Sequence, residues 1–292
     1  MRSAVALDRA VDRLERASWL DQAADAISAG LRKVIKPGPT EDVLSGTALA
    51  HPAHPMLVAV PIGAWTSATV LDCVGGNRAT TRGLVALGTI AALPAAATGA
   101  SDWLSTAQAE RRVGLVHAAA NACALGLQIA SWRARRRGRV TGAMLSAAAL
   151  ALTSVAGWLG GHLAYAQGVG VDTTVFQLLP TEWTDLCAPG DITDKPARHD
   201  VNGVPVVAYR TGSDVVVLAD RCTHRGGPLH EGFLDAAGCI TCPWHGSTFD
   251  NAGRVVSGPA TRPQPALDVR VENGRVQVRR DEQRALRLNP VS

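Results

Sequence analysis

Four long stretches of the chain contain almost no charged residues, and they restrict the possible folds more than any other feature. They cover residues 55–74, 83–100, 113–132 and 140–167 and consist mainly of Ala, Leu, Val and Gly. Each is long enough for the roughly 20 residues that cross the apolar core of a bilayer. A buried soluble bundle is the alternative, since alanine-rich helices are only moderately hydrophobic. Because charged residues crowd into the connections, we predict four membrane-spanning helices.

The last third of the chain has a different pattern, with short runs of β-branched residues separated by turn residues. Residues 204–209 and 215–219 are such runs, and residues 211–214 between them are typical of a turn. Residues 269–278 contain alternating valines on both sides of Asn273-Gly274, the strongest short-range signal for a β-hairpin. We therefore predict a small antiparallel β domain in this part of the chain.

Two segments inside the β region each offer one thiolate and one imidazole. Cys222 and His224 belong to the first segment, and Cys242, eighteen residues after His224, belongs with His245 to the second. Such a mixture indicates a metal centre. Structural zinc is the alternative interpretation, but zinc sites usually combine a pair of cysteines with a pair of histidines, whereas each segment here is mixed.

The two segments resemble the cluster-binding loops of the Rieske [2Fe-2S] family, and the resemblance runs over about residues 176–280. Residues 225–229 after the first pair and 246–250 after the second match those loops. Gly258-Pro259-Ala260 lies where the family has a proline loop that covers the cluster. The resemblance implies an all-β Rieske (ISP-like) fold that carries a [2Fe-2S] cluster.

The resemblance also assigns the ligands. Cys222 and Cys242 would hold one iron and His224 and His245 the other, which raises the reduction potential above that of an all-cysteine cluster. It further implies that His224 or His245 forms the exposed edge through which electrons arrive or leave.

Departures from the cytochrome bc type of Rieske protein point to the ferredoxin-type branch. The bc type has an additional cysteine in each loop, where this chain has Gly227 and Trp244. Ser247 stands where a hydroxyl donates to a bridging sulfide, whereas Phe249 stands where high-potential proteins have a tyrosine. Because hydrogen bonds to sulfur raise the potential, we predict a potential between the bc-type and oxygenase-type extremes. Cys239 is predicted to be a strand residue, not a ligand.

A second resemblance, to the bacterial membrane family called domain of unknown function 2231, covers about residues 44–171. The matching positions are residues 51–55, 60–63, Asp72, 160–161 and 168–171. The family name implies no activity. After Tyr165 the family often has a basic residue and a histidine, where this chain has Ala166 and Gln167.

These observations predict a multidomain protein, in which a four-helix α transmembrane bundle precedes the Rieske domain. The predicted parts are an amphipathic N-terminal region (1–43), the membrane domain (44–171), the Rieske domain (172–281) and a tail (282–292). The N-terminal helix is predicted from Leu7, Val11, Leu14 and Ser18, which recur at helical spacing among charged residues. It either lies on the membrane or caps the bundle.

Arginines in the connections predict the orientation in the cell membrane. They are Arg78 and Arg82 after the first span, and Arg133, Arg135, Arg136, Arg137 and Arg139 after the third. The positive-inside rule places both connections in the cytoplasm, so the Rieske domain of this multi-pass protein would face outward. The counterargument is that no cleavable signal peptide is visible. Arg136-Arg137 could act as an internal twin-arginine export signal, or simply anchor the topology.

Several ionisable residues fall toward the leaflet from which the Rieske domain continues: His51, His54, Asp102, His117 and His162. Such residues are costly in a membrane and are candidates for function. One hypothesis is that His117 and His162 bind a b-type haem, or act with Asp102 at a quinol site, and pass electrons to the cluster. The alternative is that each histidine bonds a neighbouring carbonyl group or reaches toward the interface.

Taken together, the sequence predicts a membrane-anchored Rieske iron-sulfur protein that transfers single electrons. Its partner is either a redox protein or the quinone pool. A quinol-oxidising membrane enzyme and a redox sensor or assembly partner are the alternative functions. No mononuclear iron motif of an oxygenase is evident, so we do not expect oxygenase activity within this chain. Whether the electron carrier is an enzyme in its own right stays open. The charge of +4 owes much to the membrane-flanking arginines and gives no reason to propose nucleic acid. The oligomeric state is not indicated.

Overall fold

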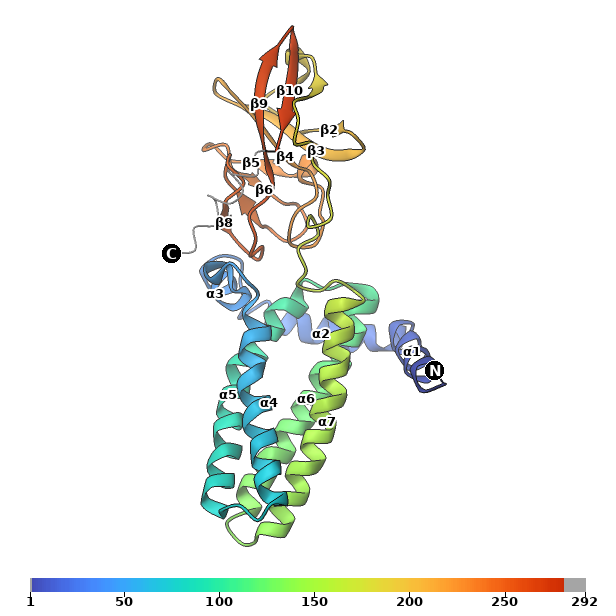
Figure 1. The fold of residues 1–292 in the computed structure, drawn as a ribbon, viewed down its shortest axis with the longest axis vertical. Helices are drawn as coiled ribbons and strands as arrows, with labels where there is room; N and C mark the ends of the chain where they lie inside the picture. Colours follow the sequence, from blue (N-terminus) through green and yellow to red (C-terminus); the bar gives the residue numbers. More distant parts are fainter. Residues whose placement is uncertain (1, 281–292) are drawn as a thin grey trace. The chain divides into compact units, whose positions relative to one another are not determined.

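The computed structural model describes residues 2–280 and divides into two compact units (Figure 1). The helical unit comprises the residues up to Lys36 together with Ala53–Val169. The β unit comprises Pro37–Pro52 and the residues from Gly170 onward. We predicted a boundary between residues 43 and 44, whereas in the structure Pro37–Pro52, directly before the first apolar helix, groups with the β unit.

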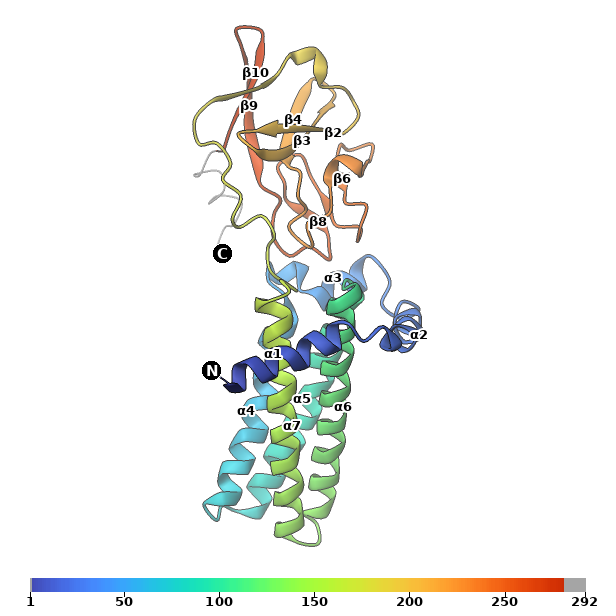
Figure 2. The same cartoon turned by 90° about the vertical axis from the view of Figure 1, so that its right-hand side faces the viewer.

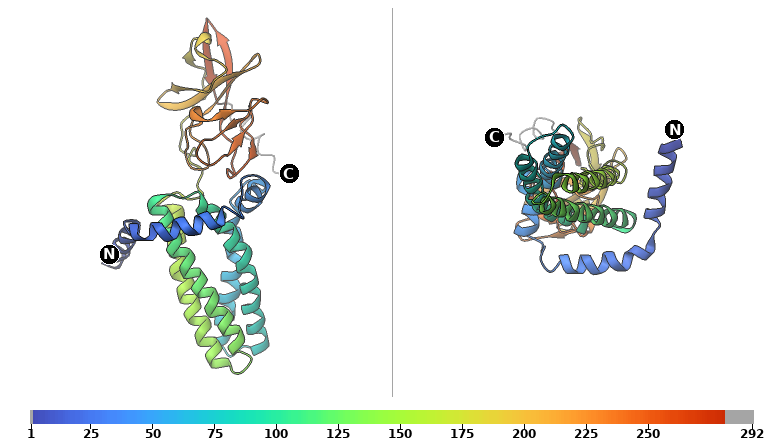
Figure 3. Two further views of the ribbon diagram at one scale, coloured as in Figure 1. Left: turned by 180° about the vertical axis from the view of Figure 1, so that it is seen from behind. Right: turned by 90° about the horizontal axis from the view of Figure 1, so that it is seen from below.

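Four long helices form the core of the helical unit and lie side by side in the view along the bundle (Figure 3). They are α4 (Ala53–Cys73), α5 (Arg78–Leu104), α6 (Gln108–Ala134) and α7 (Arg139–Tyr165). All four are long and apolar enough to cross a membrane. In the most hydrophobic 18-residue stretch of each helix, only 22–28% of the residues are buried inside the protein. Large apolar side chains such as Leu87, Ile90 and Leu93 are exposed on α5. A bundle in water would not present such a surface, so the prediction of four membrane spans is confirmed.

A buried ion pair and its hydrogen bonds join all four of these helices at the end that carries the arginine-rich connections. The guanidinium of Arg135, which is fully buried, donates to both carboxylate oxygens of Asp72, and the Nη1–Oδ1 distance is 2.9 Å. It also donates to the hydroxyl groups of Thr81 and Ser146. Because every charge here has a partner, the cost of an aspartate in an apolar helix is largely offset.

The N-terminal helices pack on the bundle. They are α1 (Arg2–Glu15), the short helix η1 (Ser18–Leu20) and α2 (Asp21–Leu31). In Figure 2, α1 crosses in front of α7 and α6, whereas α2 lies beside the bundle. Val11 packs with Val113 and Leu159, and Arg112 forms an ion pair with Asp21 at 2.6 Å. The amphipathic helix therefore contacts the bundle.

The β unit is built from two antiparallel sheets. The strands of the first, in spatial order, are β1 (Thr184–Cys187), β10 (Arg275–Arg279), β9 (Ala266–Glu272), β4 (Asp214–Ala219), β3 (Val204–Thr211) and β2 (Ala197–Val201). Those of the second are β5 (Phe233–Leu234), β6 (Ile240–Thr241), β7 (Thr248–Phe249) and β8 (Val255–Ser257). Short helices in this unit are α3 (Pro39–Ser45), η2 (Thr47–Leu49), η3 (Pro189–Asp191) and η4 (Leu229–Glu231).

Both predicted hairpins are present. Strands β9 and β10 pair around Asn273 and Gly274, which have φ angles of 52° and 74°, as a type I′ turn requires. The β3–β4 hairpin turns at Gly212, with a φ angle of 60°. Cys239 was predicted in a strand, but it lies in the turn immediately before β6, with its N–H bonded to the carboxylate of Asp235.

Candidate functional site

The two ligand segments fold as the same kind of turn. In the first, which connects β4 to β5, the N–H of Gly226 donates to the carbonyl of Cys222 at 2.8 Å. In the second, between β6 and β7, the N–H of Gly246 donates to the carbonyl of Cys242 at 3.1 Å. Both glycines have a positive φ angle, 77° and 79°, which favours glycine over other residues. The backbone therefore presents the two ligand pairs in equivalent ways.

The structure brings the four predicted ligands together as a thiol pair and an imidazole pair. Cys222 and Cys242 are 1% and 3% exposed and share a hydrogen bond between their side chains. The rings of His224 and His245 lie edge to face, with centroids 5.1 Å apart. Within residues 2–280, no three His, Cys, Asp or Glu side chains are arranged around one metal position. A thiol pair and an imidazole pair fit two metal ions with two protein ligands each.

Two further observations fit a bound cluster. Nδ1 of His224 is buried and has no hydrogen-bond partner, as expected of an atom that ligates a metal. Gly227 leaves space next to the thiols, because a Cβ there would lie 2.8 Å from Sγ of Cys242 and 3.0 Å from Cγ of Trp244. The fold and the site therefore define a mixed-ligand iron–sulfur protein.

Local electrostatics favour the ligand forms of His224 and Cys242, but not that of Cys222. Burial, with help from His245 and Arg225, lowers the pKa of His224 to about 3, so its imidazole is neutral. The hydrogen bond from Cys222 lowers the pKa of the Cys242 thiol to about 7, and the same bond raises the pKa of Cys222. A neutral imidazole and an acidic thiol are the states from which metal binding displaces few protons.

Ser247 is the residue whose hydroxyl was predicted to donate to a bridging sulfide. It is fully buried, and its Oγ accepts a hydrogen bond from the N–H of Ala260 in the proline loop at 3.0 Å. Its hydroxyl proton remains available to donate to a sulfide. Phe249, in contrast, is buried in the hydrophobic core of the β unit together with both ligand cysteines and offers no hydroxyl.

Gln264 supports the first ligand loop, and sequence reasoning missed it. Its side chain is 1% exposed and accepts from the N–H of Thr223 at 3.0 Å. Its Nε2 donates to the carbonyls of Ala219 and Arg221, both at 2.7 Å. An isolated glutamine outside the ligand motifs carries no sequence signal for such a role.

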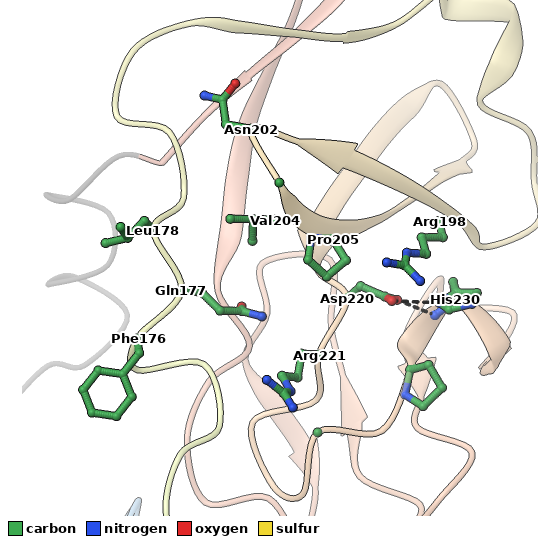
Figure 4. A pocket seen from close by; sticks show the side chains of 13 residues that line it. Phe176, Gln177, Leu178, Arg198, Asn202, Val204, Pro205, Asp220, Arg221 and His230 are labelled. Carbon is green, nitrogen blue, oxygen red and sulfur yellow. Dashed lines mark hydrogen bonds and ion pairs between the residues drawn. The ribbon is translucent and has the colours of Figure 1, made fainter.

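Asp220 was also missed. Its buried carboxylate accepts from both the backbone N–H and Nδ1 of His230 at 2.8 Å, which ties the start of the first ligand loop to η4. This pair borders a hollow of about 520 Å³ beside the loop (Figure 4). Arg198, Arg221, Phe176 and Leu178 also line this hollow.

His117 has a neighbouring backbone carbonyl as its partner, as the alternative prediction had it, whereas His162 has a carboxylate. Nδ1 of His117 lies 2.7 Å from the carbonyl oxygen of Ala156, and the His117 ring lies 6.5 Å from that of His54. Nε2 of His162, however, lies 3.0 Å from the carboxylate of Glu15. The structure therefore places His117 beside His54 and gives His162 a separate partner.

His54 resembles His117 in its surroundings. Its Nδ1 lies 2.8 Å from the carbonyl oxygen of Ala95. Each ring packs against a glycine of a neighbouring helix: a Cβ at Gly99 would lie 2.8 Å from Cε1 of His54, and one at Gly160 would lie 3.1 Å from Cε1 of His117. Asp102, the third predicted member of a quinol site, lies three residues after Gly99 on α5.

Comparison with protein families agrees with the two-part architecture. Residues 182–275 match the family described as "Rieske [2Fe-2S] domain". Residues 50–173 match the family described as "Predicted membrane protein (DUF2231)".

Individual relatives match the Rieske part. Over 99 residues the chain is 35% identical to ferredoxin CarAc of Metapseudomonas resinovorans, which covers 33% of this chain and 92% of that ferredoxin. Over 78 residues it is 36% identical to the dicamba O-demethylase oxygenase component of Stenotrophomonas maltophilia, covering 26% of this chain and 23% of that protein. Over 80 residues it is 30% identical to the cytochrome b6-f complex iron-sulfur subunit of Chlorobaculum tepidum, covering 27% and 43%. The chain belongs to the Rieske [2Fe-2S] family and carries a DUF2231 membrane domain before its Rieske domain.

The support from Gln264 generates a prediction. Replacing it in Gln264→Leu leaves the N–H of Thr223 and two loop carbonyls without their buried partner, at about 1–3 kcal/mol for each group. We expect lower iron content and faster loss of the cluster's visible absorbance than in the unmodified protein. Gln277→Leu is the matched control, since that side chain binds Asp185 at an exposed position on β10. Equal cluster retention in both variants would contradict the assigned role.

Proposed function

We propose that this protein is a membrane-anchored carrier of single electrons. The observation that carries the proposal is the division of the site into a buried thiol pair and an imidazole pair, with Nδ1 of His224 buried and unpartnered. A bound [2Fe-2S] cluster would supply one-electron oxidation and reduction. Cys222 and Cys242 would hold its buried iron, and the half-exposed His224 and His245 would hold the outer one and conduct electrons to a partner protein or to quinol.

The residues around the ligands support a reduction potential between the bc-type and oxygenase-type extremes. Gly227 and Trp244 replace the cysteines of the bc-type proteins, so no disulfide braces the loops. Ser247 offers one hydroxyl to the cluster, while Phe249 offers none. With fewer hydrogen bonds to sulfur, the oxidised form is favoured relative to the bc type.

A redox titration of the full-length protein in detergent, followed by electron paramagnetic resonance, tests the proposal. We expect a one-electron curve with a midpoint between the bc-type and oxygenase-type extremes. Cys222→Ser should abolish the signal, because one iron loses a ligand, whereas Cys239→Ser should retain it as the matched control. Zinc in place of iron in the purified protein, or a midpoint at the bc-type value, would refute this assignment.

We also propose that the Rieske domain faces outward from the cell membrane. The arginine-rich connections lie at one end of the bundle, where the Arg78 side chain donates to the carbonyl of Arg135. Near the other end, Arg111 and Arg112 are neutralised by ion pairs with Asp25 and Asp21. The short connections at the first end contain or adjoin Arg78, Arg82, Arg136 and Arg137, and the positive-inside rule favours the cytoplasm for such connections.

Protease protection tests this orientation. In intact spheroplasts we expect external protease to digest the Rieske domain, while an epitope in the α6–α7 connection is cleaved only after lysis. Full protection of the Rieske domain before lysis, together with digestion afterwards, would reverse the assignment.

A second candidate function is quinol oxidation or haem binding in the helical unit. The observation that favours it is the neighbouring pair His54 and His117, each with Nδ1 directed at a backbone carbonyl. Histidines that ligate metal usually have their other ring nitrogen fixed in this way. This pair replaces the combination of His117 and His162 that the sequence suggested.

A reduced-minus-oxidised visible spectrum distinguishes this candidate from a simple anchor. If the pair binds a b-type haem, we expect a haem band in the unmodified protein that is lost in both His54→Ala and His117→Ala but retained in His162→Ala. If only the broad Rieske bleaching is present, the haem version is excluded. Quinol-dependent reduction of the cluster that His117→Ala abolishes would then support a haem-free quinol site.

A further inference from the structure

The β unit includes a segment that is remote from it in the sequence. We call residues Pro37–Pro52 the clamp segment; it precedes the first apolar helix, yet it groups with the chain from Gly170 onward. Its helix α3 has Pro39 in the first turn and ends at Gly46, whose φ angle of 85° stops the helix. The clamp segment is therefore a defined structural element of the β unit.

The clamp segment holds the proline loop, residues 258–260, at both of its ends. Oδ1 of Asp42 accepts from the N–H of Gly258 at 2.6 Å, and the hydroxyl of Thr47 donates to the carbonyl of Ala260 at 3.2 Å. The approach is close, because a Cβ at position 258 would lie 2.3 Å from Oγ1 of Thr47 and 3.0 Å from Oδ1 of Asp42. Only glycine fits at this position.

The first of these contacts is a charge-assisted hydrogen bond in a partly buried place. Such bonds are roughly twice as strong as neutral ones. Residues 258–260 are all buried, and the hydroxyl of Ser257 adds a further contact with Asp42 at 3.4 Å. Arg262, just beyond the loop, donates to the carbonyl of Ala50 at 3.5 Å. The clamp segment thus contacts the loop and both of its flanks.

A chain of hydrogen bonds leads from the clamp segment to the second ligand loop. Thr47 donates to the carbonyl of Ala260, and the N–H of Ala260 donates to Oγ of Ser247 at 3.0 Å. The carbonyl of Ser247 in turn accepts from the N–H of Cys242 at 2.8 Å. Because Thr47 and Ser247 both bind the backbone of Ala260, a displacement of Ala260 on loss of the Thr47 bond shifts the N–H that holds the Ser247 hydroxyl.

We propose that Asp42 and Thr47 are positioning residues that fix the proline loop, orient the Ser247 hydroxyl and so tune the reduction potential. This inference rests on the proposed electron-carrier function, since a potential requires a bound cluster. It assigns a role in the Rieske domain to residues that lie on the N-terminal side of all four membrane spans. Loss of the clamp weakens the hydrogen bond from Ser247 and lowers the potential.

A double-mutant cycle on the full-length protein in detergent tests the proposal. Ser247→Ala is expected to lower the midpoint potential, and Thr47→Val to lower it by a smaller amount. In the Ser247→Ala background Thr47→Val should cause no further shift, because it acts through the missing hydroxyl. Thr47→Ser keeps the donor and should restore the original value. Val43→Ala, on the exposed side of α3, is the matched control and should not change the potential.

The iron content of each variant shows whether its cluster is retained, so that a shifted potential is not confused with a lost cluster. If Thr47→Val does not retain iron, Asp42→Ala is used in its place. An unchanged potential in Thr47→Val or Asp42→Ala with a full cluster would overturn the proposal. Equal shifts in the presence and absence of the Ser247 hydroxyl would also overturn it. If the unmodified protein shows no one-electron titration, the proposed function fails, and this result is distinct from failure of the clamp.

Discussion

The β unit depends most on the hydrogen bonds that hold its two ligand loops. Strands β5–β8 contain only two or three residues each, too few for a stable sheet by themselves. Their stability must come from the loops they connect and from the core that contains Cys222, Cys242 and Phe249. Gln264 satisfies three backbone groups of the first loop, and Ser247 joins the second loop to the proline loop. The geometry of the ligand loops and the folding of the small sheet therefore depend on each other, because both require the same buried hydrogen bonds.

In the helical unit, too, several buried polar side chains have partners within the protein. The apolar core of a membrane offers them no hydrogen bonds. Asp72 was part of the motif that linked this region to a membrane family, and its bidentate pair with buried Arg135 gives it a structural role. His54 and His117 at the opposite end each have a backbone carbonyl as partner. Their proximity, and not the presence of isolated histidines, is what makes this end a candidate for redox chemistry.

Features with a local sequence pattern were predictable, and features that depend on distant contacts were not. Length and charge distribution gave the four spans, Asn273-Gly274 gave the β9–β10 hairpin, and motif spacing gave the proposed ligands, which the structure brings close together. The clamp segment could not be foreseen, because Asp42 and its partner Gly258 are 216 positions apart and neither has an unusual neighbourhood in the sequence. The pairing of His117 with His54 instead of His162 was missed for a related reason: sequence gives the depth of a residue in a span, but not which helix face meets which neighbour.

The hydrogen bonding around the cluster site is one-sided, and this gives the clamp segment its importance. Where high-potential proteins have a tyrosine hydroxyl, this chain has Phe249, packed in the core. Ser247 is then the side-chain hydroxyl on which tuning of the potential depends, and its orientation is fixed by Ala260. With two hydroxyls, displacement of one would be partly compensated by the other. With one, the geometry of the proline loop determines the hydrogen bond, and the residues that hold that loop acquire control over the potential.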